Sequence, residues 1–124
     1  MEAPPFRWRV VYYQDRAGHS PVIEFVKGLS EPARAAVMRD IDLLAEFGLA
    51  VGAPMVKPIA GVRKLWELRV KTKDGAVRIF YLAISGKRFV MLHGFMKKTD
   101  KTPKPELEMA HKRLEAVLAE ERTP

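Results

Sequence analysis

Three strand-like segments follow one another with only short turns between them, and this run most constrains how the chain can fold. The segments are KLWELRVK (64–71), AVRIFYLAI (76–84) and RFVMLHGF (88–95). Each is rich in β-branched and aromatic residues, which favour strands. The connections contain Asp74-Gly75 and Ser85-Gly86, dipeptides typical of hairpin turns that need a positive φ. The run therefore predicts an antiparallel meander of three strands.

Further strand and helix signals flank the meander. FRWRVVYY (6–13) predicts a first strand, and Ser20-Pro21 predicts the start of a short helix over 21–29. A second helix is predicted from residue 31 to a C-cap at Gly48, because its apolar residues recur every three to four positions. The C-terminal segment 103–121 has prolines in its first turn and one apolar stripe, which is typical of an amphipathic helix.

The order of these segments predicts an α+β fold. Helices are expected to cover one face of a mostly antiparallel sheet, and residues 49–62, with two prolines and two glycines, are expected to form an ordered loop. At 124 residues the chain is expected to form one domain over 1–124. It has no apolar run long enough for a signal peptide or a membrane span, so we expect a cytoplasmic protein without a membrane partner.

Positive charge is concentrated in one part of the sequence. Residues 57–104 contain 13 Lys and Arg but only three acidic residues, which are Glu67, Asp74 and Asp100. The remaining 76 residues contain 9 basic and 12 acidic residues, so the net charge of +7 comes from this segment. Such an asymmetry indicates a polyanionic partner, because displaced counterions drive binding to phosphate backbones. A solvated basic face without a partner is the alternative.

Three charged positions in the strands have two interpretations. Alternate residues of a strand share a face, so Glu67 and Arg69 point the same way, and Arg78 lies in the middle of the next strand. An arginine in mid-sheet is costly unless it is paired, and Glu67 is the obvious partner for a structural ion pair. The other interpretation is catalytic, with arginines gripping a phosphate. The residues alone leave both open.

A phosphate-sized site is plausible where the strands bring basic residues together. The catalytic candidates are Arg69, Arg78, Lys97 and Lys98. The further candidates for substrate binding are Glu67, Lys71, His93, Phe95, Lys101 and Lys104. Among these, Phe95 is a candidate for stacking on an unpaired base, together with Phe80, although both can be ordinary core residues, which is the favoured interpretation for Phe80. His93 has the ordinary pKa of a general base, but a lone strand histidine is more often structural.

Other kinds of chemistry have no motif here. The chain has no cysteine, its three histidines are not spaced as metal ligands, and no glycine-rich phosphate loop or dinucleotide fingerprint is present. We therefore expect neither a metal nor a cofactor.

The three central segments, read together, resemble a known family. KLWELRVK, VRIFYLAI and FVMLHGFMKKTDKTPKPELEMAHKRL are similar to the HigB-type branch of the RelE/ParE toxin superfamily, a group often described as phage-derived proteins. The resemblance is close over roughly residues 60–115. It implies a RelE-like, microbial RNase-like fold with two N-terminal helices and a C-terminal helix.

The resemblance also implies a function. It implies the toxin of a type II toxin–antitoxin pair, an endoribonuclease that cleaves mRNA on the translating ribosome and so inhibits translation. The implied partners are mRNA, the ribosome and a cognate antitoxin of the HigA-like, helix-turn-helix kind, with operator DNA contacted only through the antitoxin. Carried over by position, Arg69 and Arg78 match the family's basic residues in the central strands, and Lys97 and Lys98 match those after the last strand.

A metal-free cleavage is chemically reasonable for such residues. The RNA 2′-OH can attack the adjacent phosphate when its proton is accepted, the leaving 5′-oxygen is protonated and charge on phosphorus is stabilised. We expect Arg69 and Arg78 to stabilise the phosphate, Lys97 or Lys98 to transfer a proton, and Glu67 to support the arginines. Two alternatives stay open: a ParE-like toxin that contacts DNA gyrase, and a module that binds nucleic acid without cutting it.

Overall fold

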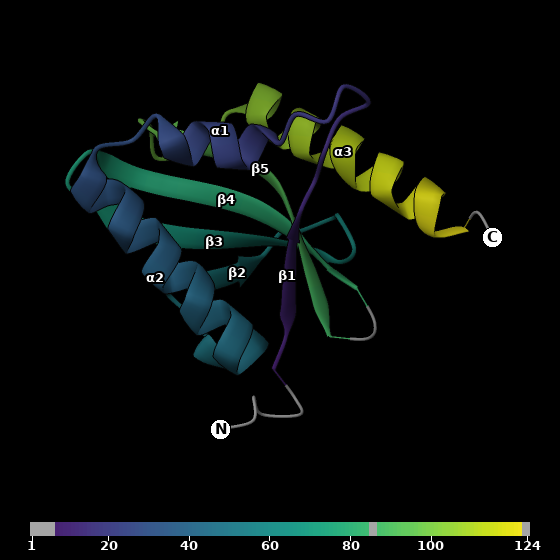
Figure 1. Cartoon of the computed structure of the whole chain (residues 1–124), viewed down its shortest axis with the longest axis horizontal. Helices are drawn as coiled ribbons and strands as arrows, with labels where there is room; N and C mark the ends of the chain where they lie inside the picture. Colours follow the sequence, from purple (N-terminus) through teal and green to yellow (C-terminus); the bar gives the residue numbers. More distant parts are fainter. Residues whose placement is uncertain (1–6, 85–86, 123–124) are drawn as a thin grey trace.

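The protein is built on one five-stranded mixed sheet. The computed structural model describes residues 7–84 and 87–122. Its elements are β1 (Arg9–Tyr12), α1 (Pro21–Lys27), α2 (Glu31–Phe47), a 3₁₀ turn η1 (Gly48–Val51), β2 (Val56–Pro58), β3 (Leu65–Thr72), β4 (Gly75–Ile84), β5 (Arg88–Lys97) and α3 (Lys104–Arg122) (Figure 1). The strands lie in the order β1-β5-β4-β3-β2. The predicted α+β class is confirmed.

The predicted meander is confirmed, and its strands form the centre of the sheet. β3 pairs antiparallel with β4, and β4 pairs antiparallel with β5. Gly75 has a φ of 132° in the turn that joins β3 to β4, a conformation that favours glycine. The second predicted turn, Ser85-Gly86, lies outside the described residues, as does Phe6 at the start of the first predicted strand.

The expected loop over 49–62 is wrong in part, because it contains η1 and the short strand β2. β2 pairs antiparallel with β3, with Val56 opposite Leu68 and Lys57 opposite Glu67. Three residues are too few to show an alternating pattern, and Pro58 argues against a strand. Proline is nevertheless tolerated here, because β2 is an edge strand that needs no further N–H donor.

The expectation of helices on one face is also wrong. α1 and α2 pack on one side of the sheet, where a core cluster includes Val26, Ile41, Leu68 and Ile79. α3 packs on the opposite side, where the cluster is Leu65, Phe80, Leu82, Val90, Leu92, Phe95, Ala110 and Leu114. The central strands carry apolar residues on both faces, and such strands need cover on both. β1 adds a parallel pair to β5, so the sheet is mixed.

The ends of α2 fix the helix against the sheet. Ser30 caps its N-terminus by accepting a hydrogen bond from the Ala33 amide (3.3 Å), and the Ser30 amide donates to Asp74 in the β3–β4 turn (2.9 Å). Gly48 follows the helix with a φ of 61°, and a Cβ there would lie 2.3 Å from the indole nitrogen of Trp8. Within the described part of the chain, no helix is long and apolar enough to cross a membrane.

Candidate active site

Strand register brings the predicted basic residues to one face of the sheet. Arg69 of β3 lies opposite Arg78 of β4, and Ala76 of β4 lies opposite Lys97 of β5, so all three cations share the face on which α3 packs. α3 covers the part of this face nearest Leu65 and Leu82, whereas the three cations line open grooves beyond it. The arginines and Lys97 therefore converge as the sequence predicts.

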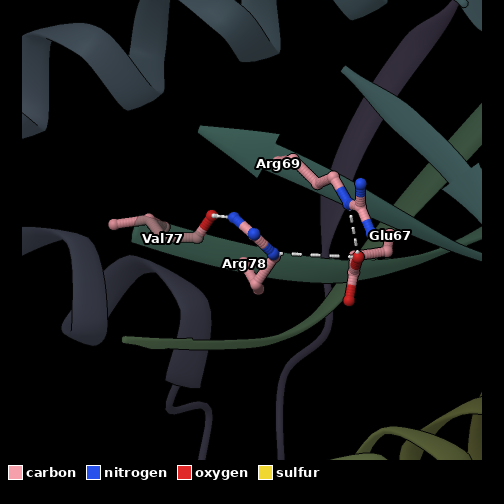
Figure 2. A network of polar contacts seen from close by, with 4 residues as sticks. All are labelled: Glu67, Arg69, Val77 and Arg78. Atoms are coloured by element: carbon pink, nitrogen blue, oxygen red, sulfur yellow. Dashed lines mark hydrogen bonds and ion pairs between the residues drawn. The ribbon is translucent and has the colours of Figure 1, made fainter. Parts of the chain in front are cut away.

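Glu67 lies beneath the two arginines and is nearly inaccessible, with 3% of its side chain exposed. Arg69 Nε donates to Glu67 Oε1 at 3.0 Å, and Arg78 Nε lies 3.8 Å from the same oxygen. Figure 2 shows Arg69 reaching toward this carboxylate from β3, whereas Arg78 on β4 has its Nε on the side of Glu67 and its outer nitrogen turned to the Val77 carbonyl. The predicted ion pairing of Glu67 is confirmed. It does not exclude a role in binding, because two guanidinium groups share one carboxylate and leave an excess positive charge.

Arg78 is held more tightly than Arg69. Its side chain is 14% exposed against 32% for Arg69, and its Nη1 donates to the backbone carbonyl of Val77 at 3.1 Å. Its Nε has no hydrogen bond, since 3.8 Å is too long for one. Burial lowers the pKa of Arg78, Glu67 opposes that shift, and Arg69 adds to it. Arg78 Nε is itself buried, so any anionic ligand would contact the exposed part of the guanidinium, and the positive charge of the group favours such a ligand.

A groove of about 320 Å³, here called the lysine groove, opens beside Arg69. Its lining residues are Lys57, Pro58, Ile59, Ala60, Glu67, Arg69, Lys97, Asp100, Lys101 and Thr102. Four of these are cations, and they come from β2, β3, β5 and the segment after β5. The groove can therefore hold a phosphate or a short stretch of polyanionic backbone.

A second groove of about 450 Å³, here called the arginine groove, lies on the other side of Arg69. Its lining residues are Arg39, Asp40, Pro54, Met55, Arg69, Lys71, Ala76 and Arg78. Lys71, a predicted binding residue, lies here with both arginines. Arg69 lines both grooves, so a strand of nucleic acid can run from one to the other across it.

Four predicted residues lie away from these grooves: Lys98, Lys104, Phe95 and His93. Lys98 follows β5 and Lys104 begins α3; both are exposed, but neither lines the lysine groove or the arginine groove. Phe95 is 5% exposed and packs against Phe80, with ring centroids 5.6 Å apart. Its ring is therefore part of the core under α3, and in this conformation it is not available to stack on a base.

His93 is held between the sheet and α3. Arg113 donates to His93 Nδ1 at 2.9 Å and also to the carbonyl of Leu92 at 2.9 Å. Because Nδ1 accepts, the ring proton belongs on Nε2, which lies 3.3 Å from Glu106 Oε1. Burial lowers the pKa of His93, Glu106 opposes that shift, and Arg113 adds to it. The histidine thus joins β5 to α3, and it lines neither groove.

Sequence reasoning missed several groove residues. Lys57 was missed because β2 was not predicted, and its position opposite Glu67 places it beside the arginines. Arg39 and Asp40 lie on α2, far from the strands in sequence, and a helical pattern shows only that they are polar. Asp100 was counted only as a charge, yet it lines the lysine groove. In the regions that the structure describes, no three His, Cys, Asp or Glu side chains are grouped to hold a metal ion.

Comparison with known proteins gives the family. Residues 24–115 match the family described as phage derived protein Gp49-like (DUF891), and this match spans more than half of the chain. The chain belongs to that family. The Gp49-like proteins are a family of RelE/HigB-like toxins, which agrees with a toxin of a toxin–antitoxin pair in general. No match was found among the curated proteins. The matched residues include α2 and all of β2 to β5, and thus both grooves.

Proposed function

We propose that this Gp49-like protein is a HigB-type toxin with a RelE-like fold, and that it cleaves mRNA without a metal on the translating ribosome. The observation that carries the proposal is the convergence of Arg69, Arg78 and Lys97 on one open sheet face above a single buried carboxylate. Membership of a family of RelE/HigB-like toxins supports it. A folded site with excess positive charge between two grooves suits a single-stranded polyanion.

The proposed reaction divides the phosphodiester by internal attack. The 2′-oxygen bonds to phosphorus, the bond from phosphorus to the 5′-oxygen breaks, and the products are a 2′,3′-cyclic phosphate and a 5′-hydroxyl. Arg69 and Arg78 stabilise the extra negative charge on the phosphorane, which develops only in the transition state. They are held in place by Glu67 through contacts of 3.0 and 3.8 Å.

Proton transfer is assigned to the lysine groove. The ammonium group of Lys97 donates a proton to the leaving 5′-oxygen, and the carboxylate of Asp100 accepts the proton of the 2′-OH. Lys97 is preferred to Lys98 because Lys97 lines the groove and Lys98 does not. Asp100 is preferred to Glu67 because Glu67 is buried and already accepts from Arg69, whereas Asp100 is exposed. Lys57 and Lys101 then bind the flanking phosphates.

A cognate antitoxin is part of the proposal. An acidic antitoxin segment that enters the two grooves would neutralise their cations and block RNA. We propose a HigA-like antitoxin with a helix-turn-helix domain, so that operator DNA is contacted only through the antitoxin. Membership of a family of RelE/HigB-like toxins and the positive charge of the grooves support this part of the proposal.

The test compares wild type, Lys97→Ala and Lys98→Ala, each induced in a bacterial host while growth and the 5′ ends of an abundant mRNA are followed. We expect arrest with new 5′ ends for wild type and Lys98→Ala, and a loss of cleavage of roughly 10²-fold or more for Lys97→Ala. The two lysines are adjacent, so Lys98→Ala is a matched control for the loss of charge.

The same experiment separates the alternatives. Arrest with intact mRNA would overturn the nuclease proposal in favour of a gyrase-directed toxin or a module that only binds nucleic acid. Equal loss of cleavage in both variants would overturn the assignment to Lys97 and indicate that the lysines act only through their summed charge.

A further inference from the structure

The arginine groove differs from the lysine groove in its chemistry. Three of its lining residues are apolar, namely Pro54, Met55 and Ala76, and the other five are charged. At about 450 Å³ it falls within the usual size of small-ligand sites, which combine apolar walls with a few polar groups. A groove that only bound phosphates would not need apolar lining residues. A flat, apolar-faced group with polar edges fits it better, and a nucleobase is such a group.

The position of the groove indicates which nucleotide of a bound RNA would place its base there. Arg69 and Arg78, which the proposed function assigns to the scissile phosphate, both line this groove. A nucleotide next to that phosphate would therefore place its base over Met55 and Ala76. The inference rests on the proposed function in this respect, since it takes the ligand to be single-stranded RNA held at Arg69.

Asp40 is the feature that a phosphate site does not explain. Its side chain is only 14% exposed, and it lines a groove that also holds four cations. Among residues 7–84 and 87–122, its one ion pair is with the adjacent Arg39, whose Nε lies 3.4 Å from Oδ1, near the limit for a hydrogen bond. A carboxylate can accept about four hydrogen bonds, so Asp40 retains acceptor capacity that faces the groove. An anion there would repel a phosphate but would accept from an amino group.

We infer that the arginine groove is a nucleobase pocket in which Asp40 and Arg39 read the polar edge of the base beside the scissile phosphate. Asp40 accepts from the exocyclic amino group of cytosine, adenine or guanine, and Arg39 donates to a neighbouring ring nitrogen or carbonyl oxygen. Uracil has no exocyclic amino group, so it leaves Asp40 unsatisfied. The pocket therefore selects against uracil at one position next to the cut.

The experiment maps cleavage at nucleotide resolution in a translating extract for wild type, Asp40→Asn and Arg39→Gln. Asp42→Asn is the matched control, because Asp42 is an exposed carboxylate on the same helix that does not line the groove. Asparagine keeps the shape of Asp40 but can also donate, so it can pair with a uracil carbonyl. We expect wild type and Asp42→Asn to disfavour uracil at one flanking position, and Asp40→Asn to weaken that preference roughly tenfold.

Arg39→Gln guards against a folding defect, because its side chain is 69% exposed and its replacement should not affect folding. Arg39→Gln is expected to lower cleavage most at sites that have cytosine, adenine or guanine, and not uracil, at that flanking position. An unchanged base preference in both variants, or an equal fall in cleavage at every site, would overturn the inference and leave the proposed nuclease intact. Absence of cleavage by the wild type would instead overturn the proposed function, and the inference with it.

Discussion

Two polar clusters occupy the same face of the sheet, and they differ in whether α3 covers them. The open cluster joins Glu67 to Arg69 and Arg78, whereas the covered cluster joins His93 to Glu106 and Arg113. In the covered cluster both ring nitrogens have partners, and its one arginine is balanced by one glutamate. In the open cluster two arginines share one carboxylate, and Arg78 Nε is buried without a hydrogen bond to any residue that the structure describes.

The difference teaches how similar residues acquire different roles. A buried polar group that is fully paired rigidifies a contact, and so the covered cluster fastens α3 to β5. An incompletely paired cation at an open face keeps the capacity to bind an anion. The comparison therefore assigns a structural role alone to the His93 cluster, and ligand binding beside its structural ion pairs to the Glu67 cluster. Only substitutions in the Glu67 cluster should lower cleavage.

The largest expected effect is on cleavage by Arg69→Ala. Removing one donor aimed at transition-state charge typically lowers a rate by about 10²–10³-fold, and we expect a loss of that size in mRNA cleavage. Arg69→Ala also leaves the buried carboxylate of Glu67 without its hydrogen-bond donor, so the free energy of unfolding should fall by about 1–3 kcal/mol. Cleavage is measured by primer extension in a translating extract, and stability by urea denaturation.

Arg9→Ala is the control for this loss of charge, because Arg9 is an exposed arginine of β1, at the far edge of the sheet. It should leave cleavage within about threefold of wild type, because it contributes only to the general field. Unaltered cleavage in Arg69→Ala, or an equal loss in Arg9→Ala, would contradict a specific role for the open cluster.

The sequence could predict which residues share a face of the sheet only where the strands are regular. Alternation within β3 and β4 correctly placed Glu67, Arg69 and Arg78 together, because both strands are long and regular. The faces of the β5 residues were harder to predict, since the pairing of β4 with β5 shifts between Phe80 and Tyr81. That irregularity changes which residues of β5 share a face, and no periodic pattern in the sequence reports it. The choice between Lys97 and Lys98 therefore needed the structure.

The groove residues that could not be predicted come from elements that reach the site only in the folded protein. Lys57 reaches the site through a three-residue edge strand, and Arg39 and Asp40 reach it from α2. His93 was a candidate for substrate binding until its partners were known, because Glu106 and Arg113 follow it by 13 and 20 residues and meet it only when α3 packs. The packing of α3 over one end of this sheet face cannot be predicted from the local sequence pattern.

Glu67→Gln should have an intermediate effect, and it tests whether this carboxylate holds the arginines or accepts the proton. Glutamine keeps an acceptor for Arg69 but loses the charge, so we expect the free energy of unfolding to fall by about 1–3 kcal/mol. Cleavage should fall by roughly tenfold, since the arginines lose only part of their support. A loss of about 10³-fold with unchanged stability would instead mark Glu67 as the proton acceptor.

His93→Gln gives the smallest expected effect, and it is seen only as pH falls. Burial lowers the pKa of His93, so below its ordinary pKa of about 6.5 the unfolded state binds a proton that the folded state does not. Wild-type stability should therefore fall with decreasing pH by up to about 1.4 kcal/mol per pH unit, until the folded-state pKa is passed. Glutamine can accept from Arg113 and donate to Glu106 without titrating, so the variant should lack this part of the pH dependence.

Urea denaturation from pH 7.5 to 5 measures this pH dependence, with substitution of the exposed His111, His111→Gln, as control. Equal pH dependence in wild type and His93→Gln would mean that the covered cluster does not fasten α3 through a neutral imidazole, and the contrast with the open cluster would then reduce to solvent exposure alone.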